Sequence, residues 1–116
     1  MKTCHLTQNR EFLRIYRRGK SVVHPLLVTY ASPNRMGVNR IGITTSKKIG
    51  NAVARNRARR IIRAAFGEQE TALNQGWDLV FVARGQTPHS TSPQISAVMR
   101  KHLERLGLLN ACEDGL

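Results

Sequence analysis

The chain has 116 residues, a length that predicts a single domain over 1–116, with its core over about 6–108. Nineteen Lys and Arg against seven Asp and Glu give a net charge of +12, which favours a polyanionic partner, and 41% hydrophobic residues in short periodic blocks argue against disorder. No apolar run is long enough to span a membrane and the N-terminus lacks a signal peptide's apolar core, so we expect a cytoplasmic protein with no membrane partner.

Seven elements with helical or strand periodicity follow one another along the chain. They are a helix over 8–18, then after a connection over 20–25 two strands over 26–31 and 40–46, a helix over 52–66, a short helical piece over 68–75, a strand over 77–84 and a helix over 92–106. This order predicts an α/β fold, a two-layer αββαβα sandwich in which helices cover a small central sheet. If the strands on either side of the long helix are parallel and adjacent, a right-handed crossover is expected.

Two faces in the first half of the chain are candidates for a binding surface. Phe12, Ile15 and Tyr16 share one face of the first helix, at a spacing that is also typical of ordinary core packing. In the second strand, Gly42, Thr44 and Ser46 share a face of small side chains. That face is either open to a ligand or the solvated side of the sandwich.

The helix over 52–66 is strongly basic. From Phe12 to Gly67 the sequence holds thirteen Lys and Arg and no Asp or Glu. At 100° per residue, one arc of this helix is apolar and formed by Ala54, Ala58, Ile61, Ile62 and Ala65. The other arc and the preceding segment carry the candidate RNA-binding side chains Lys47, Lys48, Arg55, Asn56, Arg57, Arg59, Arg60 and Arg63. Like charges four residues apart destabilise a helix, so a bound polyanion is favoured over a merely solvated face.

The arginine arc is too wide to enter a single DNA groove, and no helix-turn-helix spacing is present. A folded RNA presents its backbone from several directions and therefore fits a broad patch better. Arg outnumbers Lys fourteen to five, and guanidinium groups can bind phosphate oxygens in pairs. The basic arc therefore predicts RNA binding.

The run SKKIGNAVARNRARRIIRAAF, residues 46–66, resembles the arginine-rich "RNR" signature of the bacterial ribonuclease P protein component. Further similarity lies in EFLRIYRRGKSV, RIGITTSKK and WDLVFVAR, so that the resemblance covers residues 6–106. Tyr16 and Arg59 stand where Phe and Lys are frequent in the family, and neither departure weakens the match.

This resemblance implies the family's fold with an unusual left-handed βαβ crossover, against the right-handed expectation above. It implies that the chain joins the ribonuclease P catalytic RNA and assists removal of the 5′ leader from precursor tRNA, with Mg²⁺ held by the RNA subunit and with no obligate protein partner. The basic residues named above fall on the RNR motif and the segment ahead of it. Phe12, Tyr16, Tyr30 and Thr44 fall on the family's cleft for the leader strand.

Protein-based catalysis is not expected from the remaining polar residues. The seven acids are dispersed, and the four histidines show no metal-ligand spacing. Cys4 and Cys112 are interpreted as free thiols of a reducing cytosol. The chain alone is therefore not expected to cut RNA, and the resemblance implies that it is the non-catalytic component of an RNA-catalysed endoribonuclease. A structural ribosomal or RNA-chaperone protein and a DNA-binding regulator are the alternatives, which leader-bearing tRNA and competing duplex DNA would distinguish.

Overall fold

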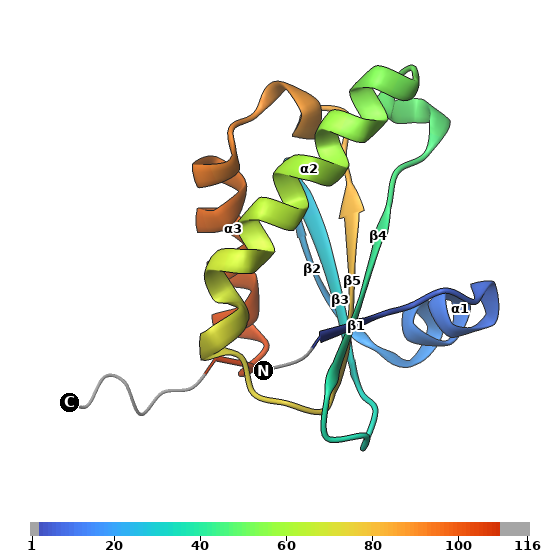
Figure 1. Cartoon of the computed structure of the whole chain (residues 1–116), viewed down its shortest axis with the longest axis vertical. Coiled ribbons are helices and arrows are strands. Elements are labelled where there is room, and N and C mark those ends of the chain that lie inside the picture. Colours follow the sequence, from blue (N-terminus) through green and yellow to red (C-terminus); the bar gives the residue numbers. More distant parts are fainter. Residues whose placement is uncertain (1–2, 110–116) are drawn as a thin grey trace.

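The computed structural model of the chain describes residues 3–109, which form a five-stranded sheet with helices on both faces (Figure 1). The strands are β1 (Thr3–His5), β2 (Lys20–His24), β3 (Leu27–Pro33), β4 (Asn39–Thr44) and β5 (Trp77–Ala83). The helices are α1 (Asn9–Arg18), α2 (Ala52–Gln69) and α3 (Ser92–Arg105), and 3₁₀ turns are η1 (Lys47–Ile49), η2 (Glu70–Ala72) and η3 (Thr87–His89). The predicted α/β class is confirmed, and the predicted elements occur in the order αββαβα, with two further strands, β1 and β2.

The strand order is β1-β4-β5-β3-β2, so that β5 lies at the centre of the sheet. β4 pairs in parallel with both β1 and β5, whereas β3 pairs antiparallel with both β5 and β2. Helices α2 and α3 cover one face of the sheet, and α1 lies across the other face (Figure 1). The sheet therefore lies between the basic helix α2 and the aromatic residues of α1.

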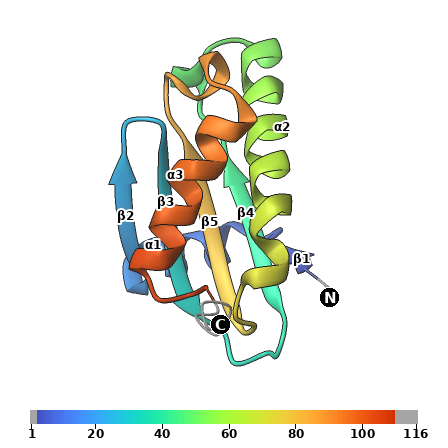
Figure 2. The ribbon, with the colours of Figure 1, turned by 90° about the vertical axis from the view of Figure 1, so that its left-hand side faces the viewer.

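The β4–α2–β5 crossover is left-handed. In Figure 2, α2 lies in front of the sheet, β4 runs upward, and its parallel neighbour β5 lies to the left of it. A right-handed crossover would place β5 on the right. The general expectation is therefore wrong for this chain, and the one implied by the family resemblance is correct.

Two strands, β1 and β2, were not predicted from the sequence. The segment 20–25 is not a plain connection, because its first five residues form β2, whose Val22 and Val23 pair with Thr29 and Val28 of β3. β1 precedes the predicted core and pairs with β4, from Thr3 opposite Asn39 onward. Both are edge strands with weak local signals: β1 has three residues and a distant partner in β4, and β2 is a short, largely exposed strand that forms a hairpin with the following strand β3.

The ends of two helical segments also differ from the prediction. α2 continues three residues beyond Phe66 to Gln69, whose buried amide donates to Ser96 Oγ of α3 at 2.7 Å. The helical piece predicted over 68–75 is reduced to the single turn η2, because the end of α2 takes its first residues. None of the helices within residues 3–109 is both long and apolar enough to cross a membrane.

Each face of the sheet has its own core. Alternation along β5 directs Leu79 and Phe81 toward α2 and α3, and Val80 toward α1. On the first face, Ala58, Ile62 and Ala65 of α2 are buried as predicted. The core on the α1 face is smaller and contains Leu6, Ile15 and Val80, with Phe12, Tyr16, Tyr30 and Val82 partly buried around them.

Candidate nucleic-acid interface

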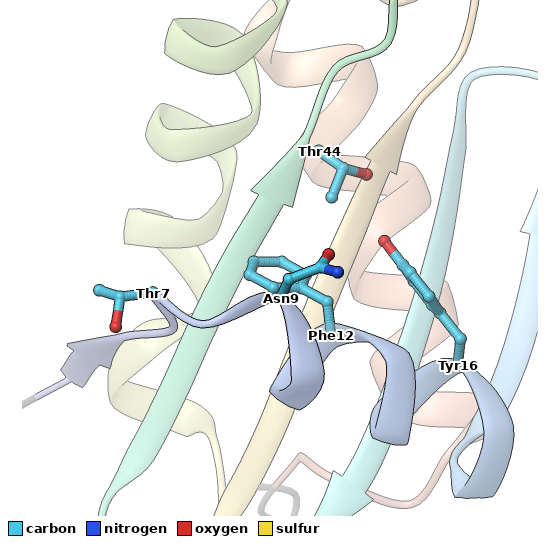
Figure 3. Close-up of a pocket in the computed structure, with 5 residues that line it drawn as sticks. All are labelled: Thr7, Asn9, Phe12, Tyr16 and Thr44. Carbon is cyan, nitrogen blue, oxygen red and sulfur yellow. The ribbon is translucent and has the colours of Figure 1, made fainter.

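A pocket of about 300 Å³ lies where α1 crosses the end of β4 (Figure 3). We call it the aromatic cleft, and its lining residues are Thr7, Asn9, Phe12, Tyr16 and Thr44. Three of them come from α1, Thr44 is the last residue of β4, and Thr7 lies just before α1. The structure thus brings together three of the four predicted cleft residues, Phe12, Tyr16 and Thr44, from segments about thirty residues apart.

Phe12 is seated directly on the backbone of β4 at Gly42. A Cβ atom at Gly42 would lie 2.4 Å from Phe12 Cε1 and 2.5 Å from Cζ, so only glycine leaves room for the ring. This settles the role of the small face of the second predicted strand. Gly42 is buried beneath Phe12, and Thr44 beyond it lines the pocket.

Tyr30, the fourth predicted cleft residue, does not line the pocket. It projects from β3 and packs edge-on against Tyr16, with ring centroids 4.9 Å apart and an interplanar angle of 67°. An edge-to-face pair of this kind fixes the orientation of both rings. Tyr30 is therefore placed to hold Tyr16 in position at the wall of the cleft.

Thr7 and Asn9 were not among the predicted cleft residues. Asn9 lies three residues before Phe12, a spacing that puts both on neighbouring parts of the α1 surface, and this could have indicated it. With Thr44 they give the cleft three uncharged polar side chains beside two aromatic rings. A lining without charged groups suits a neutral, flat ligand such as a nucleobase better than a phosphate.

An ion-pair network attaches α1 to the sheet next to the cleft. The guanidinium of Arg40 on β4 donates to both carboxylate oxygens of the buried Asp78 on β5, each at 2.8 Å, and to Glu11 Oε2 on α1 at 2.6 Å. Desolvation acts to raise the pKa of Glu11, but the hydrogen bond from Arg40 and those from the backbone hold it below its ordinary value. The pKa of Arg40 is raised, chiefly by its hydrogen bonds with Asp78. The network holds Glu11, the residue immediately before Phe12, against the sheet.

The basic helix α2 begins as the sequence predicts, because the Asn51 side chain accepts a hydrogen bond from Ala54 N at 3.0 Å. Arg57, Arg60 and Arg63 are exposed, as is Asn56, while Arg55 and Arg59 are half-buried. Within residues 3–109 none of these arginines pairs with an acidic side chain, and Arg59 Nη1 donates a hydrogen bond to Asn56 Oδ1 at 3.3 Å. The predicted basic arc is therefore free to bind a polyanion.

Lys47 and Lys48 connect the two parts of the candidate interface. They lie in the turn η1, three and four residues after Thr44, and both are exposed. Ser46 caps this turn by accepting from Lys48 N at 3.3 Å. The chain thus passes from the rim of the cleft through two cations to the start of α2.

The acidic side chains of the described region are already engaged. Glu11 and Asp78 bind Arg40, Glu70 accepts from Thr3, Glu68 accepts from Ser96, and Glu104 pairs with Arg100. Across residues 3–109 no three His, Cys, Asp or Glu side chains gather in a way that could hold a metal ion. Cys4 is an exposed free thiol, and Cys112 lies outside the described residues.

A buried histidine lies under β3, away from the cleft. His102 of α3 is 3% exposed, and its Nδ1 is 2.8 Å from Thr29 Oγ1 in a hydrogen bond. Burial lowers the pKa of His102 to about 4, with smaller contributions from His24 and Arg105. The imidazole is therefore neutral at physiological pH, and its Nε2 has no partner within the described residues.

An uncharged aromatic cleft and an exposed basic helix, joined by a turn that carries two lysines, are features typical of nucleic-acid-binding proteins. The sequence model of the Ribonuclease P family matches residues 1–107. The ribonuclease P protein component of Clostridium botulinum (strain Loch Maree / Type A3) is 38% identical over 111 residues, which are 95% of this chain and all of that protein. The Clostridium novyi protein of the same name is 40% identical over 94% of this chain and 98% of its own length.

Solved structures agree with the sequence matches. The RNase P protein of Staphylococcus aureus has a TM-score of 0.82 and 33% identity, covering 94% of this chain and all of that one. The RNase P protein of Thermotoga maritima has a TM-score of 0.67 and 28% identity, covering 88% of this chain and 93% of that one. The chain therefore belongs to the ribonuclease P protein family, as the resemblance in its sequence indicated, and this membership connects it with tRNA processing.

Proposed function

We propose that the chain is the protein subunit of a ribonuclease P ribonucleoprotein, which binds the catalytic RNA through α2 and holds the 5′ leader of precursor tRNA in the aromatic cleft. The observation that carries this proposal is the direct passage from Thr44 at the cleft to Lys47 and Lys48 and on to α2. A single strand lying in the cleft would have cations beside its backbone where it leaves the rings.

The cleft supplies binding that tolerates many leader sequences. A base stacked on Phe12 or Tyr16 is worth about 1 to 3 kcal/mol, and every base offers the same kind of face. Polar groups of Thr7, Asn9 and Thr44 surround the rings without adding charge. Leaders of different sequence can therefore be held with similar affinity.

The basic helix supplies the affinity for the RNA backbone. Its arginines can form paired hydrogen bonds with phosphate oxygens, and each phosphate that is neutralised releases counterions. If five phosphates are neutralised on single-stranded segments, the logarithm of the binding constant plotted against the logarithm of the salt concentration has a slope of about −3.5. Binding should therefore weaken steeply as the salt concentration rises.

The protein contributes positioning rather than chemistry. Its described carboxylates are dispersed and engaged, a donor set that does not fit a catalytic Mg²⁺, so we assign the Mg²⁺ of the cleavage reaction to the RNA subunit. Reduced phosphate repulsion and an oriented leader lower the cost of bringing the substrate to that RNA. We propose that the complex acts in the cytoplasm and that the chain needs no further protein partner.

Cleavage of a leader-bearing precursor tRNA at low Mg²⁺ tests the proposal. Protein alone, a bacterial ribonuclease P RNA alone and the two together are compared, and only the mixture should cut efficiently at the leader junction. Arg57→Ala with Arg60→Ala should lose the stimulation, while Lys101→Gln with Arg105→Gln, which removes two exposed charges from α3, should keep it. A mixture no faster than RNA alone would leave the chain as a structural RNA-binding protein.

A further inference from the structure

The outer side of α1 carries arginines that the cleft does not use. Arg10, Arg14 and Arg18 follow one another at four-residue spacing with Arg17 beside them, and all four are exposed. We call these four residues the α1 arginine row. The row extends about 12 Å along the helix, since each residue rises about 1.5 Å. Arg10 and Arg14 line one hollow, and Arg14 and Arg18 line a second.

The row and the cleft lie on opposite flanks of α1. At 100° per residue, and with the buried Ile15 as origin, Phe12 and Tyr16 point about 60° and 100° to one side. Arg14 and Arg18 point about 100° and 60° to the other side. A strand held in the cleft therefore does not lie along the row, which must meet a different segment of any bound nucleic acid.

Among the residues that the structure describes, no acidic side chain pairs with the row. Glu11 is the one acid on α1, and its carboxylate is already bound by Arg40 at 2.6 Å. No ion pair of residues 3–109 includes a member of the row, and Arg10 instead donates to Gln8 Oε1 at 2.8 Å.

The helix dipole does not account for the whole row. Cations at the C-terminal end of a helix are stabilising, which accounts for Arg17 and Arg18. Arg10 stands in the first turn, where a positive charge is unfavourable, and Arg14 repels both of its neighbours in the row. An external polyanion removes both penalties.

We infer that the α1 arginine row binds the phosphate backbone of a double-stranded segment of the catalytic RNA. No aromatic side chain interrupts the row, so it offers guanidinium groups for phosphates and no aromatic ring for unpaired bases. A paired segment presents its backbone and keeps its bases inside. The inference rests on the proposed function for the identity of the RNA.

Two surfaces on opposite faces of the sheet explain why the segment belongs to the catalytic RNA rather than to the substrate. α1 and α2 lie on different faces of the sheet (Figure 1), so one RNA contact at each fixes the protein in a single orientation. A contact through α2 alone would leave the protein free to rotate about that contact. With both contacts in place, the cleft beside α1 stays directed toward the incoming leader.

Equilibrium binding of the catalytic RNA, without substrate, across a range of salt concentrations tests the inference. Arg14→Gln with Arg18→Gln should reduce the magnitude of the slope of log K against log salt by about 1.8, which is two phosphates on a duplex. Lys101→Gln with Arg105→Gln, with the same loss of charge, should leave the slope unchanged. Arg10→Gln with Arg17→Gln is a second pair from the row, and thermal melts establish that each variant is folded.

Hydroxyl-radical footprinting of the same complexes, and of complexes to which precursor tRNA has been added, locates the contact. The row variants should lose protection of one paired segment that Arg57→Ala with Arg60→Ala retains. Slopes and footprints equal to those of the α3 control would overturn the inference and leave the proposed function intact. Loss of protection only on tRNA would overturn the assignment to the catalytic RNA, and absence of RNA binding by the wild-type chain would overturn the inference and the proposed function together.

Discussion

Replacement of Gly42 by alanine tests how the aromatic cleft is built. The added Cβ would lie 2.4 Å from Phe12 Cε1 and 3.3 Å from Leu6 Cδ1, so the Phe12 ring must leave its seat on β4. Overpacking of this kind costs about 1 to 3 kcal/mol of the free energy of unfolding. We expect a loss of stability in that range, because the core on the α1 face is small and has few ways to adjust.

The same substitution should weaken leader binding more than tRNA binding. If the displaced ring no longer offers its face, one stacked base is lost, at about 1 to 3 kcal/mol. This corresponds to a decrease in affinity of roughly 5- to 150-fold, since about 1.4 kcal/mol is tenfold. The affinity of the reconstituted complex for mature tRNA, which has no leader, should not change.

The assay compares leader-bearing precursor and mature tRNA with the wild-type protein and two glycine variants. Gly67→Ala is the matched control, because a Cβ at this α2 position meets nothing within 4 Å. It should raise the free energy of unfolding by about 0.5 to 1 kcal/mol, as alanine does within a helix, and leave leader preference unaltered. An unchanged leader preference in a destabilised Gly42→Ala protein, or equal losses for both tRNAs, would refute the argument.

Two further predictions concern the buried polar groups. Arg40→Met should lower the free energy of unfolding, measured with urea, by about 3 to 5 kcal/mol, because Asp78 is left buried without its cation. The double variant Arg40→Met with Asp78→Leu should recover most of that loss. An Arg40→Met protein as stable as the wild type would show that the ion pair is not needed for stability. His102 has its pKa lowered from 6.5 to about 4 in the folded state, so the unfolded chain binds the proton first and stability should fall, by up to about 3 kcal/mol, as the pH decreases from 6.5 toward 4. Above pH 6.5 the melting temperatures of the wild type and of His102→Gln should change in parallel with pH, and below pH 6.5 that of the wild type should fall more steeply. Parallel curves at all pH values would contradict the lowered pKa of His102.

The sequence was sufficient for the parts of the fold that have strong local patterns. The buried face of α2, with Ala58 and Ile62, and the cap at Asn51 follow directly from helical periodicity and from the hydrogen-bonding chemistry of the cap. β5 was placed correctly because a run of apolar residues marks a central strand. Local patterning does not mark β1, which has three residues and pairs with the distant β4, or β2, whose short and largely exposed segment forms a hairpin with β3.

The cleft could be predicted only in part for a similar reason. Phe12 and Tyr16 share a helix face, but that spacing alone equally predicts ordinary core packing, and the resemblance to a family suggested the cleft. The contact between Phe12 and Gly42 joins residues thirty positions apart, and no periodicity in either segment reports it. The handedness of the β4–α2–β5 crossover likewise depends on the whole sheet.

The position of β5 has a consequence for how the chain acquires its structure during synthesis. Every residue that lines the cleft lies before position 45, yet the floor beneath α1 includes Val80 of the central strand. β3 and β4 do not pair with each other, and each forms hydrogen bonds with β5, which is synthesised later. High contact order of this kind delays folding until the late strand is available. On a translating ribosome, the arginine-rich segment therefore leaves the exit tunnel before the sheet that will support it can close.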